Sequence, residues 1–260
     1  MRPWHLNISS VSRLALFPSP DHTREAVRKL VEILGDDLAL FCVVDDHLHV
    51  VLVCDERTLQ PRVRALTRSV RALAAVEVNP THVRRVEGRK HMQTLLDYVL
   101  RQPSKHDLLV HPALWEGGCL PDLVGARRLP GLRLRIMEAL PRATQADALC
   151  AVGLPEARLE PMDLHTVRTL GPARLLSAAA AATCSDPRLR SKRRGAADAR
   201  RAACSLAKKA GIPMSELAWQ LGVTPRACRR MVAHPGVQGL EEVVLRRLAL
   251  EERVAVATRR

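Results

Sequence analysis

Two histidines stand one residue apart in a stretch of strand-forming residues, VVDDHLHVVLV, at positions 43–53. Successive side chains of a β-strand point to opposite faces, so His47 and His49 share one face. Two imidazoles on one face can bind a divalent metal ion when a third ligand approaches from another element. A histidine pair in a strand is more often hydrogen-bonded within the fold, so a metal site needs a second feature to support it.

The second feature is the segment LLDYVLRQP, at positions 95–103, which contains the only tyrosine of the chain. On a helix, Tyr98 and Gln102 are one turn apart and lie on the same face. Pro103 is expected to end this helix just beyond Gln102. A lone tyrosine on a helix is more often structural, and Tyr98 becomes a candidate nucleophile only together with the histidines.

Together, the two features resemble the single-tyrosine HUH nucleases, named for a His-hydrophobe-His motif. More narrowly, they resemble the REP-associated tyrosine transposases and their insertion-sequence relatives. The tetrapeptide DHLH at 46–49 stands where the family has its histidine motif, and Tyr98 with Gln102 matches its Tyr-x-x-x-Gln helix. The opening WHLNISSVSR resembles the family's first strand, and the resemblance covers about residues 4–115.

The resemblance implies a metal-dependent, transposase-like endonuclease and strand transferase. In it, His47, His49 and Gln102 would bind Mg²⁺ or Mn²⁺. Tyr98 would attack a phosphate of single-stranded, hairpin-containing DNA and form a 5′-phosphotyrosine intermediate. Two ring nitrogens and one amide oxygen suit Mn²⁺ at least as well as Mg²⁺, which prefers oxygen ligands.

The sequence departs from the family pattern in two places. The Met-Pro that commonly precedes the histidine turn is Val44-Asp45 here. The Asn-Pro that often follows the tyrosine in REP-associated proteins is Gln102-Pro103, which is nearer the insertion-sequence form. His91 and His106 lie on or just past the same helix, so both stay open as alternatives to Gln102 as third ligand.

The elements that would position these residues alternate between strand and helix patterns. Strands are expected within 4–17, 38–45, 47–54 and 81–87, and helices at 23–37, 58–76 and 90–102. The order β-α-β-β-α-β, with one further helix, predicts an α+β fold with a ferredoxin-like antiparallel sheet and helices on one face. The resemblance identifies this part as an HUH nuclease domain.

We expect three parts: an HUH nuclease domain at 1–118, which the resemblance implies, a mostly helical connection at 119–187, and a basic helix-turn-helix DNA-binding domain at 188–260, which charge sets apart. The net charge is +14, and the last 73 residues carry 17 Lys and Arg against 6 Asp and Glu. A positive surplus of this size indicates an anionic partner, and nucleic acid is the first candidate.

The basic region contains a pattern typical of a helix-turn-helix, in an otherwise all-α part of the chain. Ser215 is expected to cap the first helix, Gly222 to end it, and Thr224 to cap a second helix at 225–232. That second helix carries three arginines that would contact double-stranded DNA or a hairpin stem: Arg226, Arg229 and Arg230. A three-helix module that binds no DNA is the alternative. The segment also resembles the C-terminal domain of bacterial replication initiators.

The helix expected at 58–76 carries a further row of arginines on the side away from its apolar stripe. They are Arg64, Arg68 and Arg71. A solvated helix face is the usual explanation for such a row. The alternative is a surface that follows the DNA backbone.

No stretch of the sequence approaches the roughly 18 apolar residues that a membrane span needs, so we do not expect a membrane protein. We expect a bacterial cytoplasmic protein associated with the nucleoid, as a monomer or a homodimer. Two other functions stay open. One is a DNA-binding regulator with a catalytically inactive HUH fold, and the other is a nickase that resembles replication initiators.

Overall fold

The structure, a computed structural model, describes residues 1–106, 108–155, 157–234 and 236–259. The chain forms two compact units, which we describe separately. The first contains Met1–Leu123 and Leu129–Ala157, and the second contains Val124–Arg128 and Arg158–Arg260. The division into three domains stays a prediction.

The first unit is built on a four-stranded antiparallel sheet with the strand order β2-β3-β1-β4. The strands are β1 (Arg2–Ser9), β2 (Leu38–Val43), β3 (His47–Cys54) and β4 (His82–Arg85). β1 pairs with β3 along its whole length and with β4 over residues 4–7. β2 and β3 form the expected hairpin. This sheet and the many helices confirm the α+β class.

The first strand is shorter than expected, since it ends at Ser9 and not near Phe17. Leu16 and Phe17 are nevertheless buried, and both of their backbone N–H groups donate to the carbonyl oxygen of Asp45, at 2.7 and 3.1 Å. The apolar residues that suggested a longer strand therefore belong to an irregular segment that packs into the core.

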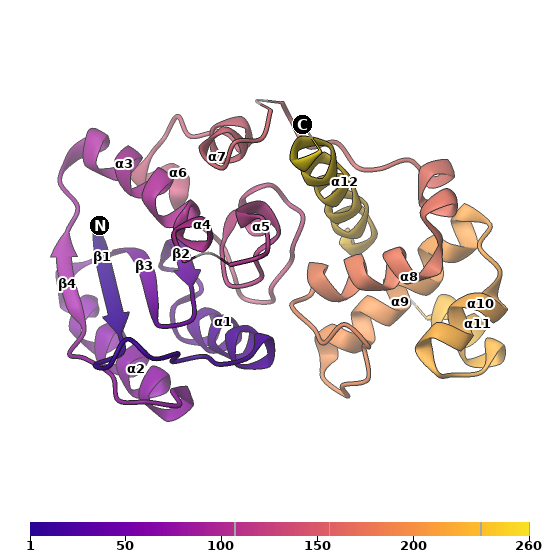
Figure 1. Ribbon diagram of the computed structural model, residues 1–260, viewed down its shortest axis with the longest axis horizontal. Coiled ribbons are helices and arrows are strands. Elements are labelled where there is room, and N and C mark those ends of the chain that lie inside the picture. The colour runs from indigo at the N-terminus through magenta and orange to yellow at the C-terminus, as the bar shows by residue number, and fades with distance from the viewer. Residues whose placement is uncertain (107, 156, 235, 260) are drawn as a thin grey trace. The chain divides into compact units, whose positions relative to one another are not determined.

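Two helices, α1 (Pro20–Leu34) and α2 (Glu56–Leu73), pack against each other. They lie on the side of the sheet away from α3 (Gly88–Leu100), as Figure 1 shows. The buried apolar residues of α2 recur every three or four positions, as an amphipathic helix requires, and are Leu59, Val63, Leu66 and Val70. The helix α3 is thus an addition to the helices that we expected on one face.

The third helix ends two residues earlier than we expected. α3 stops at Leu100, Arg101 forms a joint, and a separate short helix, α4, covers Gln102–Lys105. Pro103 explains the break, because its ring cannot donate a hydrogen bond and clashes with the carbonyl group four residues earlier, that of Val99. At the start of α4 the same proline is tolerated, since the first turn of a helix lacks backbone acceptors.

The rest of the first unit consists of short helices between irregular segments. They are η1 (Pro112–Leu114), α5 (Leu120–Leu123), α6 (Ile136–Ala139) and α7 (Gln145–Ala151). α7 begins with a capping box, in which Thr144 and Asp147 bind each other's backbone N–H groups, and it packs against α3. The connection that we expected to be mostly helical, at 119–187, is therefore only partly helical in its first part, up to residue 157.

The second unit is all-helical. Its helices are α8 (Leu164–Ala182), α9 (Arg194–Ala210), α10 (Met214–Leu221), α11 (Pro225–Ala233) and α12 (Leu240–Thr258). Alanine dominates the contact between α8 and α9, with Ala178, Ala179, Ala199 and Ala203 all fully buried. Small side chains permit two helices to approach closely. α12 packs on both of these helices and buries Leu240, Val244 and Leu248.

The α10–α11 segment follows the expected pattern except at its first residue. α10 begins at Met214, preceded by Pro213, so Ser215 is not its capping residue as we had expected. Gly222 ends α10 in the left-handed conformation, with φ of 66°, which glycine adopts without strain. Thr224 caps α11 by accepting a hydrogen bond from the N–H of Ala227, at 3.2 Å.

Thr224→Ala is expected to destabilise the second unit by about 1 kcal/mol, because the helix loses the acceptor for one of its first N–H groups. Thr224→Ser keeps the hydroxyl oxygen and is expected to change stability far less. Denaturant unfolding of both variants, followed by circular dichroism, measures the difference. Equal midpoints for the two variants would mean that the cap contributes nothing.

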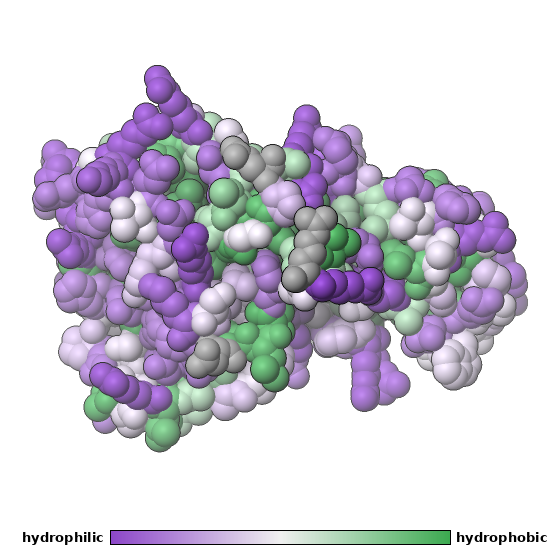
Figure 2. Space-filling model, turned by 45° about the horizontal axis from the view of Figure 1, so that its top comes forward, coloured by the Kyte–Doolittle hydropathy of each residue, from purple (hydrophilic) through white to green (hydrophobic). Residues whose placement is uncertain are grey.

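Hydrophilic residues cover most of the face shown in Figure 2, with smaller hydrophobic areas between them. Two large apolar side chains stand out by exposure, Leu109 and Trp219, the latter at 80%. Among the helices that the structure describes, we find none with the length and apolar character needed to span a bilayer.

Candidate active site

The β2–β3 hairpin places both histidines of the HLH motif at the start of β3. His47 is the first residue of the strand and lies opposite Ser9 of β1. His49 lies opposite Asn7 of β1 and opposite Cys42 of β2, so it is held between two neighbouring strands. This position explains why His49 is only 2% exposed.

Three side-chain atoms meet above this face of the sheet. The Nε2 atoms of His47 and His49 are 3.0 Å apart, and Oε1 of Gln102 lies 3.3 Å from Nε2 of His47. Gln102, itself 1% exposed, donates from Nε2 to the carbonyl oxygen of Tyr98 at 3.1 Å, which leaves its Oε1 turned towards the histidines. The three residues predicted as metal ligands are therefore close together, although they come from β3 and α4.

Tyr98 lies beside this group, on α3. Its ring centroid is 5.1 Å from that of His49 in an edge-on arrangement, which places α3 over the histidine face of the sheet. The side chain is 39% exposed, so a large substrate can reach it. The ammonium group of Lys105, on α4, lies 4.0 Å from the centroid of the same ring.

A second set of possible metal-ligand atoms lies on the other side of the His47 ring. Oδ1 of Asp46 is 2.6 Å from Nδ1 of His47, and the rings of His106 and His47 are 4.6 Å apart. Nδ1 of His106 is 3.4 Å from Oδ1 of Asp45 and 3.5 Å from Oδ1 of Asp46. Asp46, His47 and His106 could therefore also hold a metal ion, with ligand atoms within 4.8 Å of one another.

The remaining predicted residues lie elsewhere. His91, an alternative third ligand, instead accepts a hydrogen bond from the backbone N–H of Glu87 at 3.1 Å. The three α2 arginines are exposed on a helix that packs against α1, and they are Arg64, Arg68 and Arg71. The three α11 arginines are exposed in the second unit, and they are Arg226, Arg229 and Arg230.

Burial keeps two imidazoles of this region neutral. Burial, assisted by the charges of His47, His5 and other neighbours, lowers the pKa of His49 to about 3. Burial, assisted by His82, His91 and Arg84, lowers the pKa of His5 to about 4. A neutral imidazole is the form that binds a metal ion, so His49 can act as a ligand at neutral pH.

We expect these two shifts to make the metal-free protein lose stability as the pH falls from 6.5 towards 4. In the unfolded chain, His5 and His49 each take up a proton near pH 6.5, whereas in the folded chain they stay neutral. The unfolded state then binds more protons, so the free energy of unfolding falls with pH, by at most about 1.4 kcal/mol per pH unit for each group. Above pH 6.5 neither residue adds pH dependence.

Denaturant unfolding at a series of pH values across this window measures the slope. A double variant, His5→Gln with His49→Gln, removes both groups and is expected to show a flatter profile than the natural protein. Carboxylates contribute to both profiles, and the comparison cancels them. An equally steep profile in the double variant would contradict the prediction.

Sequence reasoning missed two residues of this site. His5 contacts His49, with Nε2 of His5 and Nδ1 of His49 3.1 Å apart, and this contact depends on the register between β1 and β3. Lys105 follows Tyr98 by seven positions and Gln102 by three, a spacing that places residues on one side of a helix. That spacing could have identified Lys105. His5 belongs to the opening stretch that resembles the family's first strand, but the resemblance assigned it no role at the site.

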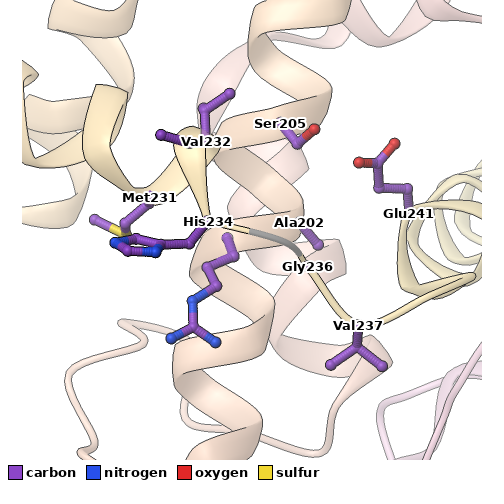
Figure 3. Close-up of a pocket in the computed structure, with 10 residues that line it drawn as sticks. Ala202, Ser205, Met231, Val232, His234, Gly236, Val237 and Glu241 are labelled. Atoms are coloured by element: carbon purple, nitrogen blue, oxygen red, sulfur yellow. The ribbon is translucent and has the colours of Figure 1, made fainter.

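A cavity of about 330 Å³ lies in the second unit, and its described lining residues include none of those predicted for catalysis or metal binding. Its wall comes from α9, from the end of α11 and from the segment that follows α11 (Figure 3). The charged groups at its edge already have partners: Arg201 donates to Asp198 at 3.1 Å, and Lys209 donates to Glu241.

No protein-family model matches the chain, and no curated protein matches it either. Among solved structures, the chain is similar to a REP-associated tyrosine transposase bound to a REP hairpin. That similarity has a TM-score of 0.40 and 15% identity, over 51% of this chain and 82% of the other. A likeness of this size carries no functional argument, which depends instead on the arrangement of His47, His49, Gln102 and Tyr98.

Proposed function

We propose that this protein is a metal-dependent, transposase-like endonuclease and strand transferase that acts on single-stranded, hairpin-containing DNA. One observation carries the proposal: Nε2 of His47, Nε2 of His49 and Oε1 of Gln102 meet beside an accessible Tyr98. In this proposal the antiparallel sheet with its covering helices is a ferredoxin-like HUH nuclease domain.

The residues fit a divalent metal ion. Two imidazole nitrogens and an amide oxygen converge, and the Nδ1 atoms of His47 and His49 are occupied by Asp46 and His5. Both histidines thus have Nε2 directed to the same place. His47, His49 and Gln102 would hold Mn²⁺ or Mg²⁺, and when bound the ion would polarise the scissile phosphate.

Tyr98 performs the covalent step. Its phenol gives up the proton, the phenolic oxygen bonds to the phosphorus, and the bond between phosphorus and the 3′-oxygen breaks. The departing 3′-oxygen takes up a proton, which leaves a free 3′-hydroxyl and a 5′-phosphotyrosine. The ammonium group of Lys105 lies over the Tyr98 ring, and in this proposal it would bind an oxygen of the same phosphate.

The second unit supplies site recognition in this proposal. α10 and α11 are the two helices of a helix-turn-helix, and the exposed arginines of α11 contact double-stranded DNA or the stem of a hairpin. The arginines of α2, on the side of the sheet away from Tyr98, would contact the DNA backbone at a distance from the cleavage site. DNA is therefore the common partner of both units.

A covalent-capture experiment tests the proposal. The purified protein is incubated with Mn²⁺ and single-stranded oligonucleotides from its own genomic flanks, and the products are resolved on a denaturing gel. We expect an adduct that forms with Mn²⁺ and is lost in EDTA, and sequencing of the attached DNA identifies the site. DNA retained on a native gel without any adduct would favour the DNA-binding regulator instead.

A further inference from the structure

His5, on β1, contacts His49, one of the proposed metal ligands. It lies two residues before Asn7, which pairs with His49, so by the alternation of a strand His5 shares the face of His49. Nε2 of His5 is 3.1 Å from Nδ1 of His49, and the two ring centroids are 5.2 Å apart. His5 thus contacts the one ring nitrogen of His49 that does not face His47.

A histidine that binds a metal through Nε2 must carry its remaining proton on Nδ1. That proton needs an acceptor, because an unsatisfied N–H in a buried site costs free energy. His49 is 2% exposed, so water is a poor substitute for a protein acceptor. Among the residues that the structure describes, the partner of this Nδ1 atom is Nε2 of His5.

We propose that His5 is a positioning residue, which accepts a hydrogen bond from Nδ1 of His49 and so directs Nε2 of His49 to the metal ion. Asp46 does the same for His47, whose Nδ1 lies 2.6 Å from Oδ1 of Asp46. Each imidazole ligand is then oriented by one partner from outside the metal site. This inference rests on the proposed metal site but concerns a residue outside the ligand set.

Mn²⁺ affinity of the full chain, measured by isothermal titration calorimetry, tests the inference. His5→Phe keeps a ring but accepts no hydrogen bond, and we expect it to weaken Mn²⁺ binding about 10- to 100-fold. His5→Gln offers both a donor and an acceptor at similar reach, and we expect affinity within about threefold of the natural protein. Thermal unfolding of the metal-free variants shows that each is folded.

The outcomes separate this inference from the proposed function. If the natural protein binds no Mn²⁺, the proposed metal site itself is wrong. If the natural protein binds Mn²⁺ and His5→Phe binds equally well, the metal site stands and the role of His5 is overturned. Equal weakening by Phe and Gln also overturns that role, since it would not depend on the hydrogen bond.

A measurement on the natural protein covers the case in which His5→Phe does not fold. In protein with ¹⁵N-labelled histidine and saturating Mg²⁺, the ring signals of His5 report which nitrogen carries the proton. We expect Nδ1 to be protonated and Nε2 to be free, as an acceptor must be. Protonated Nε2 in the metal-bound protein would overturn the inference.

Discussion

Tyr98→Phe is expected to abolish the covalent DNA adduct, with a loss of at least about a thousandfold, while DNA binding stays unchanged. Phenylalanine has no oxygen that could bond to phosphorus, so no phosphotyrosine can form. The ring itself remains, and with it the contacts of residue 98 with His49 and Lys105. The adduct is measured on denaturing gels with Mn²⁺, and binding on native gels with the same hairpin oligonucleotide.

Lys105→Gln provides a matched control for this experiment. It removes the charge beside the Tyr98 ring but leaves the phenol, so we expect a slower reaction and an adduct that still forms. If Tyr98→Phe formed as much adduct as the natural protein, another residue would be the nucleophile. The catalytic role that we propose for Tyr98 would then be wrong.

His49→Ala is expected to eliminate Mn²⁺ binding and adduct formation, whereas His106→Ala is expected to weaken Mn²⁺ binding by about tenfold or less. The two variants distinguish the two donor sets around His47. His49 belongs only to the set with Gln102, and His106 only to the set with Asp46. Removing a proposed inner ligand is expected to cost far more affinity than removing a residue outside the proposed ligand set.

Calorimetry of both variants with Mn²⁺ measures the two affinities. Because His49 is buried, its alanine variant leaves a cavity, and thermal unfolding without metal must show that it is folded. A large loss in His106→Ala with little loss in His49→Ala would assign the ion to Asp46, His47 and His106. Tyr98 would then face a different ligand set from the one that we propose.

The hairpin could be predicted from the sequence because strand alternation and a two-residue turn are local properties. The closeness of Gln102 to Tyr98 followed from a helical spacing, although the helix in fact breaks between them, whereas the closeness of Gln102 to the histidines was implied only by the family resemblance. The contact survives the break because Gln102 still donates to the carbonyl oxygen of Tyr98. A correct pairing was thus predicted with an incorrect element boundary.

The role of His5 could not be predicted in the same way. It depends on which residue of β1 lies opposite His49, and that register is fixed by contacts between segments more than forty positions apart. The early end of β1 has a similar origin, since the apolar Leu16 and Phe17 satisfy the core without a strand partner. Tertiary contacts decide such features, and a local pattern does not contain them.

Because the chain leaves helical geometry at Arg101, the proposed nucleophile and the proposed third ligand lie on two different helices. Tyr98 belongs to the helix before the joint, and Gln102 and Lys105 belong to the short helix after it. Nε of Arg101 donates to the carbonyl oxygen of Ala151, at the end of α7 and 50 positions further along the chain. This hydrogen bond ties the connection between the proposed nucleophile and the proposed third ligand to a distant segment, where a change in length or sequence could alter their alignment without changing either residue.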